Sequence, residues 1–237
     1  MKTCLITGAA RRLGKHLAIG FAQKGWNVIL HYNQSDPSDT LNKVKQFGVE
    51  VFPVKFDLQN LKEIINGFEL IQKNFFVPNV LINNAGVFPK RKSLMDTSID
   101  EWDWVMNINL RSVFITSQQF CKIAPKGSRI INVASEGAHK IWKERITYNV
   151  SKSALVTLTK ALARDLAPHI SVNSISPGYI QFEDDPNQNE ELIPKEKIPK
   201  RRYSTANEVF EIVYFLATTT DYLTGQDIRI DGGLGLF

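Results

Sequence analysis

The sequence predicts an α/β fold, a doubly wound parallel sheet with helices on both faces. Short apolar runs rich in β-branched residues alternate with longer amphipathic segments along the whole chain. This alternation is typical of βαβ units, whose crossover helices cover both faces of a parallel sheet. No shift in composition, repeat or low-complexity segment marks a boundary, so we expect one domain over residues 1–237.

Each expected element has the length and pattern of its kind. The strand-like runs are residues 2–7, 27–32, 50–56, 80–83, 129–134, 171–175 and 227–230. The segments between them have the lengths of amphipathic helices, expected near residues 12–24, 36–47, 60–74, 98–122, 147–167 and 205–219. Ser98 and Glu101 have the spacing of a capping box at the start of the fourth helix.

The longest segment without clear periodicity lies between residues 177 and 204. It follows the carboxyl end of a strand, where open α/β sheets bind ligands, and irregular segments of this length are more often functional than inert. We therefore expect a substrate loop at about 179–204 that closes over the site as a lid. Its acidic cluster, residues 183–185, either contacts an amine on the substrate or keeps the loop soluble.

Composition excludes several function classes. The net charge of +5 is spread along the chain without aromatic-basic interleaving, so no nucleic-acid partner is expected, although a phosphorylated ligand is compatible. The two cysteines belong to no metal-ligand set or disulfide framework, so we expect no metal. No apolar run is long enough for a bilayer, and the first strand begins directly at the N-terminus. We expect a cytoplasmic protein with no membrane partner.

A phosphate-binding turn is expected after the first strand. The sequence from Thr7 to Gly14 contains Gly8 and then Arg11, Arg12 and Leu13, and a helix follows. Glycine lets the backbone approach a pyrophosphate, and the helix N-terminus supplies free N–H groups and a positive dipole end. Arg12 occupies a position where a glycine is expected in such a turn.

The end of the second strand favours NADP(H) over NAD(H). An acid near this point usually binds a free ribose 2′-hydroxyl, but none occurs before Asp36. His31, Asn33 and Ser35 stand there instead, and hydrogen-bond donors together with the arginines of the turn suit a 2′-phosphate. The alternative is that these residues are ordinary loop polars.

Tyr148 and Lys152 lie four residues apart in an expected helix, which places them on one face. A neighbouring positive charge lowers the pKa of a phenol, so Tyr148 can act as a general acid or base. The alternative is an ordinary exposed helix face.

These features resemble the classical short-chain dehydrogenase/reductase family, and further motifs carry the resemblance over essentially the whole chain. In chain order, they are Asp57-Leu58, Asn83-Asn84-Ala85-Gly86, Asn109, Ser135, Pro177-Gly178 and the closing strand from Leu223 to Gly233. The resemblance implies a Rossmann-type domain that transfers hydride between a nicotinamide and a carbonyl carbon. It assigns NADP(H) contacts to Gly8, Arg11, Arg12, Leu13, His31, Asn33, Ser35, Asp57, Leu58, Asn84, Ala85, Gly86, Tyr148, Lys152, Pro177, Gly178 and Ile180.

The resemblance also implies roles for four catalytic residues. Tyr148 gives its proton to the developing alkoxide, and Lys152 lowers the pKa of that phenol and holds the nicotinamide ribose. Ser135 hydrogen-bonds the carbonyl oxygen and stabilises its charge. Asn109 holds a water that connects Lys152 to solvent.

Two signatures compete for the substrate. Arg12, His31 and Phe88 resemble pteridine reductases, where an aromatic residue at this position stacks a flat pterin, although Phe88 could equally anchor the loop. Ser135 instead resembles 3-oxoacyl-thioester reductases, because pteridine reductases carry an aspartate there. Phe182 stands where many relatives have a threonine that contacts the nicotinamide amide. The expected substrate contacts are Phe88, Ser135, Tyr148 and Phe182.

The leading hypothesis is an NADPH-dependent reductase of a small-molecule carbonyl or an acyl thioester such as a 3-oxoacyl carrier. The alternative is a dihydropterin reductase, and a remote one is a non-catalytic NADPH-binding sensor. Family members usually pair the helices expected at 98–122 and 147–167, so the resemblance also implies a homo-oligomer, a tetramer or a dimer.

Overall fold

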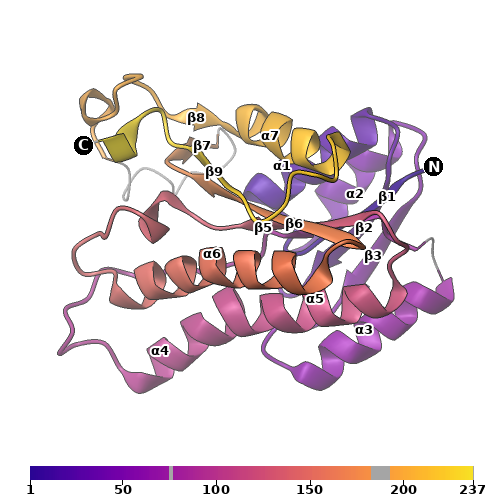
Figure 1. The fold of residues 1–237 in the computed structure, drawn as a ribbon, viewed down its shortest axis with the longest axis horizontal. Coiled ribbons are helices and arrows are strands. Elements are labelled where there is room, and N and C mark those ends of the chain that lie inside the picture. Colours follow the sequence, from indigo (N-terminus) through magenta and orange to yellow (C-terminus); the bar gives the residue numbers. More distant parts are fainter. Residues whose placement is uncertain (75–76, 183–192, 237) are drawn as a thin grey trace.

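The central element is a seven-stranded sheet in which every neighbouring pair is parallel, in the order β3-β2-β1-β4-β5-β6-β9 (Figure 1). The computed structural model describes residues 1–74, 77–182 and 193–236. The strands are β1 (Thr3–Ile6), β2 (Asn27–Tyr32), β3 (Val51–Lys55), β4 (Val80–Asn83), β5 (Ser128–Val133), β6 (Ile170–Pro177) and β9 (Asp227–Ile230). The predicted fold class is confirmed.

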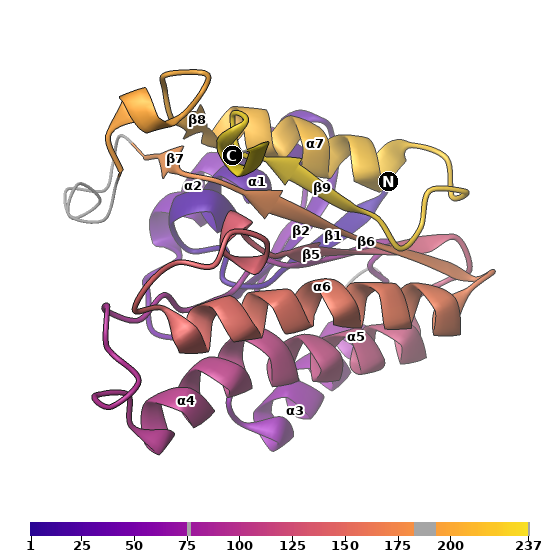
Figure 2. The ribbon, with the colours of Figure 1, turned by 60° about the vertical axis from the view of Figure 1, so that its left-hand side comes forward.

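Helices cover both faces of this sheet (Figures 1 and 2). One layer contains α1 (Arg12–Gln23), α2 (Ser38–Lys45) and α7 (Ala206–Thr218), and the other contains α3 (Leu61–Asn74), α4 (Ile99–Met106), α5 (Ser112–Ile123) and α6 (Ile146–Leu166). Each layer buries an apolar cluster against its face of the sheet, with Phe21 and Phe210 in the first and Phe68 and Phe120 in the second. Among the residues described, no helix is both long and apolar enough to cross a membrane.

The strand order reverses between β1 and β4, and this reversal positions the site. Connections from β1 and from β4 leave in opposite directions, so a crevice opens at the carboxyl ends of these two strands. The turn after β1 and the Asn-Asn-Ala-Gly segment after β4 meet there. Thr7 Oγ1 accepts hydrogen bonds from the backbone N–H groups of Asn84 and Ala85, both at 3.0 Å.

The expected single helix at 98–122 is interrupted. A π-helical segment, Asn107–Arg111, separates α4 from α5. The irregular segment after β6 also contains short elements that periodicity did not predict: β7 (Ile180–Gln181), a 3₁₀ turn at Lys195–Lys197 and β8 (Ser204–Thr205), where β7 and β8 pair in parallel. The acidic cluster expected in the loop lies outside the described residues.

The capping box predicted at the start of α4 is only half formed. Ser98 accepts a hydrogen bond from the N–H of Glu101, but the Glu101 carboxylate pairs with Lys92. Lys92 lies in the loop after β4, so tertiary contact overrides the local motif. A complete capping box instead starts α7, where Thr205 and Glu208 each accept the other's backbone N–H.

Candidate active site

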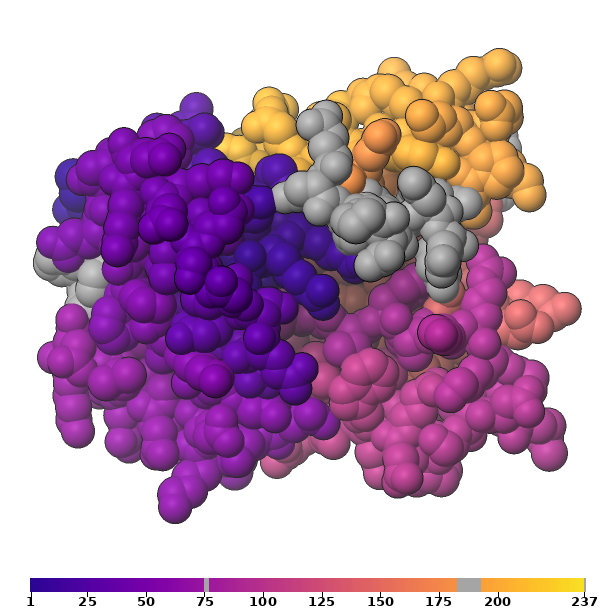
Figure 3. Space-filling view, turned by 180° about the vertical axis from the view of Figure 1, so that it is seen from behind, coloured from indigo at the N-terminus to yellow at the C-terminus, as the bar shows by residue number. Residues whose placement is uncertain are grey.

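A cavity of about 500 Å³ lies at the carboxyl edge of the sheet. In the space-filling view the surface is hollowed between the indigo N-terminal part of the chain and the magenta part (Figure 3). All the residues for which we predicted a cofactor contact line this one cavity, and so do Phe88, Ser135 and Phe182. Asn109 is buried behind the wall.

The glycine turn forms one end of the cavity. Gly8 has a φ of +65°, and a Cβ on it would lie 3.0 Å from Ala85, so only glycine fits. Asn84 donates from Nδ2 to the carbonyl oxygens of Thr7 at 2.9 Å and Gly8 at 3.2 Å. The turn is therefore fixed from the β4 side by side-chain hydrogen bonds.

His31 fixes the turn from the β2 side. The N–H of Gly8 donates to His31 Nδ1 at 3.0 Å, so the ring proton lies on Nε2, which is 3.0 Å from the carbonyl oxygen of Phe56. The ring is 1% exposed and stacks on Phe56, and burial lowers the pKa of His31 to about 4. His31 is thus a neutral support whose ring nitrogens are already engaged. The expectation that it offers a hydrogen-bond donor to a phosphate is wrong.

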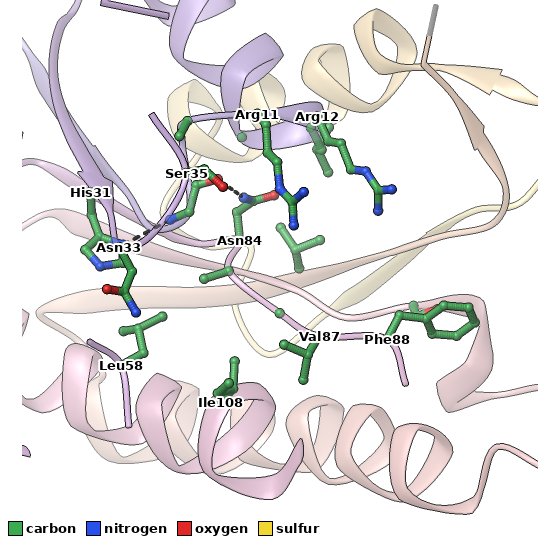
Figure 4. A pocket seen from close by; sticks show the side chains of 18 of the residues that line it. Arg11, Arg12, His31, Asn33, Ser35, Leu58, Asn84, Val87, Phe88 and Ile108 are labelled. Atoms are coloured by element: carbon green, nitrogen blue, oxygen red, sulfur yellow. Dashed lines mark hydrogen bonds between the residues drawn. The ribbon is translucent and has the colours of Figure 1, made fainter. Parts of the chain in front are cut away.

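Two arginines stand at the start of α1. Arg11 is the N-cap residue, and its side chain does not cap the helix. Figure 4 shows both side chains extending from the turn into the pocket. Arg12 has a φ of +46°, a left-handed conformation that costs a non-glycine residue about 1 kcal/mol or more. This backbone conformation is the reason that a glycine is expected at this position. A helix N-terminus with two guanidinium groups fits the phosphates of a dinucleotide.

A buried polar network lies behind the cavity. Asn109 is fully buried in the π-helical segment, accepts the N–H of Val87 on Oδ1 at 2.8 Å and donates to the Val87 carbonyl oxygen at 3.0 Å. It also donates to Ser151 Oγ at 3.1 Å, and Ser151 donates to the carbonyl oxygen of Tyr148 at 2.8 Å. Asn109 therefore connects the loop after β4 to the helix that carries Tyr148.

Ser135, Tyr148 and Lys152 line the same cavity as the glycine turn. Ser135 follows β5, and its Oγ accepts the backbone N–H of Gly137 at 3.2 Å. Burial raises the pKa of Tyr148 to about 12, and the Ser135 hydroxyl and the charge of Arg145 oppose this rise. The expected lowering of the Tyr148 pKa by Lys152 is not what the structure has, because desolvation of the phenol outweighs the neighbouring charges.

The Lys152 side chain contacts the central sheet and also lies near Tyr148. Its Nζ donates to the carbonyl oxygen of Val133 at 2.8 Å and lies 5.9 Å from the centre of the Tyr148 ring. Burial lowers the pKa of Lys152 to about 8. Lys152 thus connects the first half of α6 to the end of β5.

Aromatic side chains form the wall beside Tyr148. The Phe88 ring lies edge-on to the Tyr148 ring with the ring centres 4.6 Å apart, and Trp142 stacks on Tyr148 at 6.1 Å. Phe182 lines the cavity and packs towards α1, where its ring centre is 6.0 Å from that of His16. The wall therefore offers flat apolar surface to a substrate.

Several lining residues were missed from the sequence. Trp104 and Ile108 extend the apolar wall from α4 and the π-helical segment. Their spacing of four residues, directly before Asn109, is a signal that could have placed them on the cavity side. His139, four residues after Ser135, is not among the lining residues, and its Nε2 lies 2.8 Å from Asp227 Oδ2.

Glu136, next to Ser135, is fully buried and bound by Arg229 on β9. Arg229 donates to its two carboxylate oxygens at 3.0 and 2.6 Å and also contacts Asp231 at 3.1 Å. This pair fastens the segment that carries Ser135 to the C-terminal strand.

Arg229→Met should lower the free energy of unfolding by about 3 kcal/mol at neutral pH, because it leaves a buried carboxylate without its partner. Burial raises the pKa of Glu136, and Arg229 opposes that rise. The pKa of Glu136 is therefore higher in the folded protein than in the unfolded one. At a pH above both pKa values the ionised Glu136 lowers the stability, and this penalty disappears as the pH falls below both pKa values. Urea unfolding should show a smaller loss at mildly acidic pH, and Glu136→Gln/Arg229→Met should recover stability. A loss of equal size at both pH values contradicts this assignment.

One cavity is lined by a glycine turn at a helix N-terminus and by Ser135, Tyr148 and Lys152, here called the Ser–Tyr–Lys group. This combination defines a dinucleotide-dependent oxidoreductase. Residues 8–235 match the family described as Enoyl-(Acyl carrier protein) reductase. The chain belongs to the short-chain dehydrogenase/reductase family.

Similar proteins match over almost the full chain. The 3-oxoacyl-(acyl-carrier-protein) reductase of Buchnera aphidicola is 36% identical over 241 residues, which cover 98% of this chain and 97% of that protein. The 2-dehydro-3-deoxy-D-gluconate 5-dehydrogenase of Dickeya dadantii is 33% identical over 244 residues, 98% of this chain and 94% of that protein. A short-chain dehydrogenase from Burkholderia cenocepacia, solved with NADP, has a TM-score of 0.91 and 28% identity, and the match covers 98% of this chain and 97% of that one. The protein is an oxidoreductase of this family that acts on a small-molecule substrate.

Proposed function

We propose that this protein is an NADPH-dependent reductase of carbonyl groups on small molecules or acyl thioesters, such as a 3-oxoacyl carrier. The observation that carries the proposal is one cavity lined both by Ser135, Tyr148 and Lys152 and by Arg11 and Arg12. The Buchnera relative reduces a 3-oxoacyl group, by its name, and it is similar over nearly the whole chain.

NADPH, when bound, supplies a hydride to the carbonyl carbon, and the chain supplies the proton and the positioning. A phenol whose pKa is raised to about 12 stays protonated at neutral pH, which is the state a proton donor needs. Tyr148 gives this proton to the carbonyl oxygen, and Ser135 orients that oxygen by a hydrogen bond. The product is an alcohol, and Tyr148 regains its proton from solvent.

The residues at the glycine turn support NADPH rather than NADH. Arg11 and Arg12 suit the extra phosphate, and Asn33 and Ser35 after β2 offer uncharged polar groups where a carboxylate would repel it. Lys152, on the same side as Tyr148, has the position to hold the nicotinamide ribose.

The test is the initial rate of NADPH oxidation with two substrates in parallel, a 3-oxoacyl thioester and a dihydropterin, with NADH as the control. We expect turnover of the thioester with NADPH. Absence of turnover with any ketone or thioester would count against a carbonyl reductase. A rate with NADH equal to that with NADPH would contradict the cofactor assignment.

A second candidate, a dihydropterin reductase, is favoured by the aromatic wall. Phe88 and Phe182 line the cavity, and Arg12 enters it from the turn. Flat heteroaromatic rings stack well on such surfaces. Turnover of the pterin alone would support this candidate, and Ser135 would then stand in place of the usual aspartate.

We also propose that copies of this chain associate through the outer faces of α5 and α6. Phe114 on α5 is 48% exposed, and Leu110, Ala154 and Leu158 line a shallow apolar hollow beside it. Phe114→Glu is expected to convert a dimer or tetramer into a monomer, as measured by gel filtration with light scattering, because a charge would be buried at the contact. A wild-type monomer would contradict this proposal.

A further inference from the structure

A second buried cation lies beside Tyr148, in addition to Lys152. Arg145 immediately precedes α6, three residues before Tyr148, and is 2% exposed. The central carbon of its guanidinium lies 4.1 Å from the centre of the Phe88 ring. That ring in turn contacts Tyr148 edge-on, with the ring centres 4.6 Å apart. Phe88 is therefore held between a guanidinium and the phenol.

The two cations, Arg145 before α6 and Lys152 on it, differ in how their charge responds to pH. Burial lowers the pKa of Lys152 to about 8, so its charge is lost in the alkaline range where a phenol ionises. The guanidinium of an arginine stays charged throughout this range. The described groups that affect the ionisation of the Tyr148 phenol are Arg145, Ser135 and Tyr179, and Lys152 lies near the ring. The charge of Arg145 favours the phenolate, and Tyr179 opposes it.

The position of Arg145 also separates it from the substrate. Phe88, Ser135 and Tyr148 line the cavity, and the guanidinium lies against Phe88 rather than on the lining. Among the described residues, Arg145 is therefore placed to act on Tyr148 by its charge and through Phe88. A guanidinium over an aromatic face is attracted by the negative charge of that face, so Arg145 restrains the position of the Phe88 ring.

We propose that Arg145 is a positioning residue for Tyr148, whose permanent charge stabilises the phenolate and whose stacked guanidinium holds Phe88 against the phenol. The inference rests on the proposed function, in which Tyr148 exchanges a proton with the substrate oxygen. It extends that function by assigning the control of this proton to a residue outside the Ser–Tyr–Lys group.

The pH dependence of the reverse reaction tests the proposal. Oxidation of the alcohol product with NADP⁺ needs the phenolate, so kcat/KM rises with pH through the ionisation of Tyr148. Arg145→Gln removes the favourable charge and should move this rise upward by about one pH unit, the lower end of the effect of an adjacent charge. Arg145→Lys should keep most of the wild-type profile. Lys143→Gln is the matched control, since Lys143 is exposed two residues earlier and should leave the profile unchanged.

Two outcomes would overturn the proposal. One is an Arg145→Gln profile that coincides with the wild type even if KM or thermal stability has changed, which would mean a structural role alone. The other is an equal shift in Lys143→Gln, which would mean a general effect of charge. If Arg145→Gln does not fold, Arg145→Met keeps a long stem against Phe88 and is used in its place.

A titration without substrate separates this inference from the proposed function. The near-ultraviolet absorbance of the phenolate is followed in the wild type and in Tyr148→Phe, and the difference reports Tyr148 alone. The same difference in the Arg145→Gln background should show ionisation at higher pH. If the wild type reduces no carbonyl, the proposed function fails while this titration still supports or overturns the role of Arg145.

Discussion

Replacing Tyr148 by Phe should lower kcat for carbonyl reduction by about 10²–10⁴-fold, the contribution of a positioned general acid. The substitution removes one hydroxyl and keeps the ring that packs against Phe88 and Trp142. NADPH affinity should stay within a few fold of the wild type, because the ring still fills its place in the wall. Initial rates of NADPH oxidation and a fluorescence titration with NADPH measure the two quantities.

Tyr222→Phe is the matched control for this result. The Tyr222 side chain is 94% exposed and is not among the residues that line the cavity, so the control removes a phenol hydroxyl away from the site. Its kcat should stay near the wild-type value. Retained turnover in Tyr148→Phe would exclude Tyr148 as the proton donor and would favour a different acid.

Introducing a carboxylate after β2 should reverse the cofactor preference. Asn33→Asp places a negative charge at the cavity end where the 2′-phosphate of NADPH is proposed to bind. A hydrogen bond to a charged group contributes about 1.5–3 kcal/mol, so the NADPH/NADH ratio of kcat/KM should fall by roughly 10- to 150-fold. The loss should come from a higher KM for NADPH, because the substitution lies at the opposite end of the cavity from Tyr148.

The control for this change is Asn42→Asp, the same substitution on the exposed surface of α2. It should leave the ratio unchanged. If Asn33→Asp and Asn42→Asp behave alike, the end of β2 does not select the cofactor. A wild-type preference for NADH would contradict the assignment before any variant is made.

The alternation of strands and helices made the fold predictable, because it depends on side-chain periodicity that each segment carries by itself. The bounds of β2, β4 and β9 agree with the prediction to the residue. The π-helical segment could not be predicted in this way, since Asn107–Arg111 contains neither proline nor glycine. Its wider turn accompanies the contact of Asn109 with Val87, a residue from another part of the chain.

The members of the site were predictable, but their electrostatics were not. The motif spacing identified residues that line one cavity. The neutral state of His31 depends on Phe56, whose ring centre lies 4.0 Å from that of His31. Phe56 follows β3, far from His31 in the sequence. The pKa of Tyr148 likewise depends on its burial in the folded chain rather than on the four-residue spacing to Lys152. Arg145 was missed because only the folded chain shows that Phe88 covers it.

The π-helical segment also sets the rotation of α4 relative to α5 about their common helix axis. Before it, Trp104 points its side chain towards the cavity, and after it, Phe114 is exposed on the outer side. Deleting one residue between Asn107 and Arg111 to make the helix regular would rotate one half against the other by about 100°. Either Trp104 would then no longer face the cavity, or Phe114 would no longer lie on the proposed association face. The π-helical segment thus decides which side chains of this continuous helical stretch face the cavity and which lie on the proposed, solvent-exposed association face.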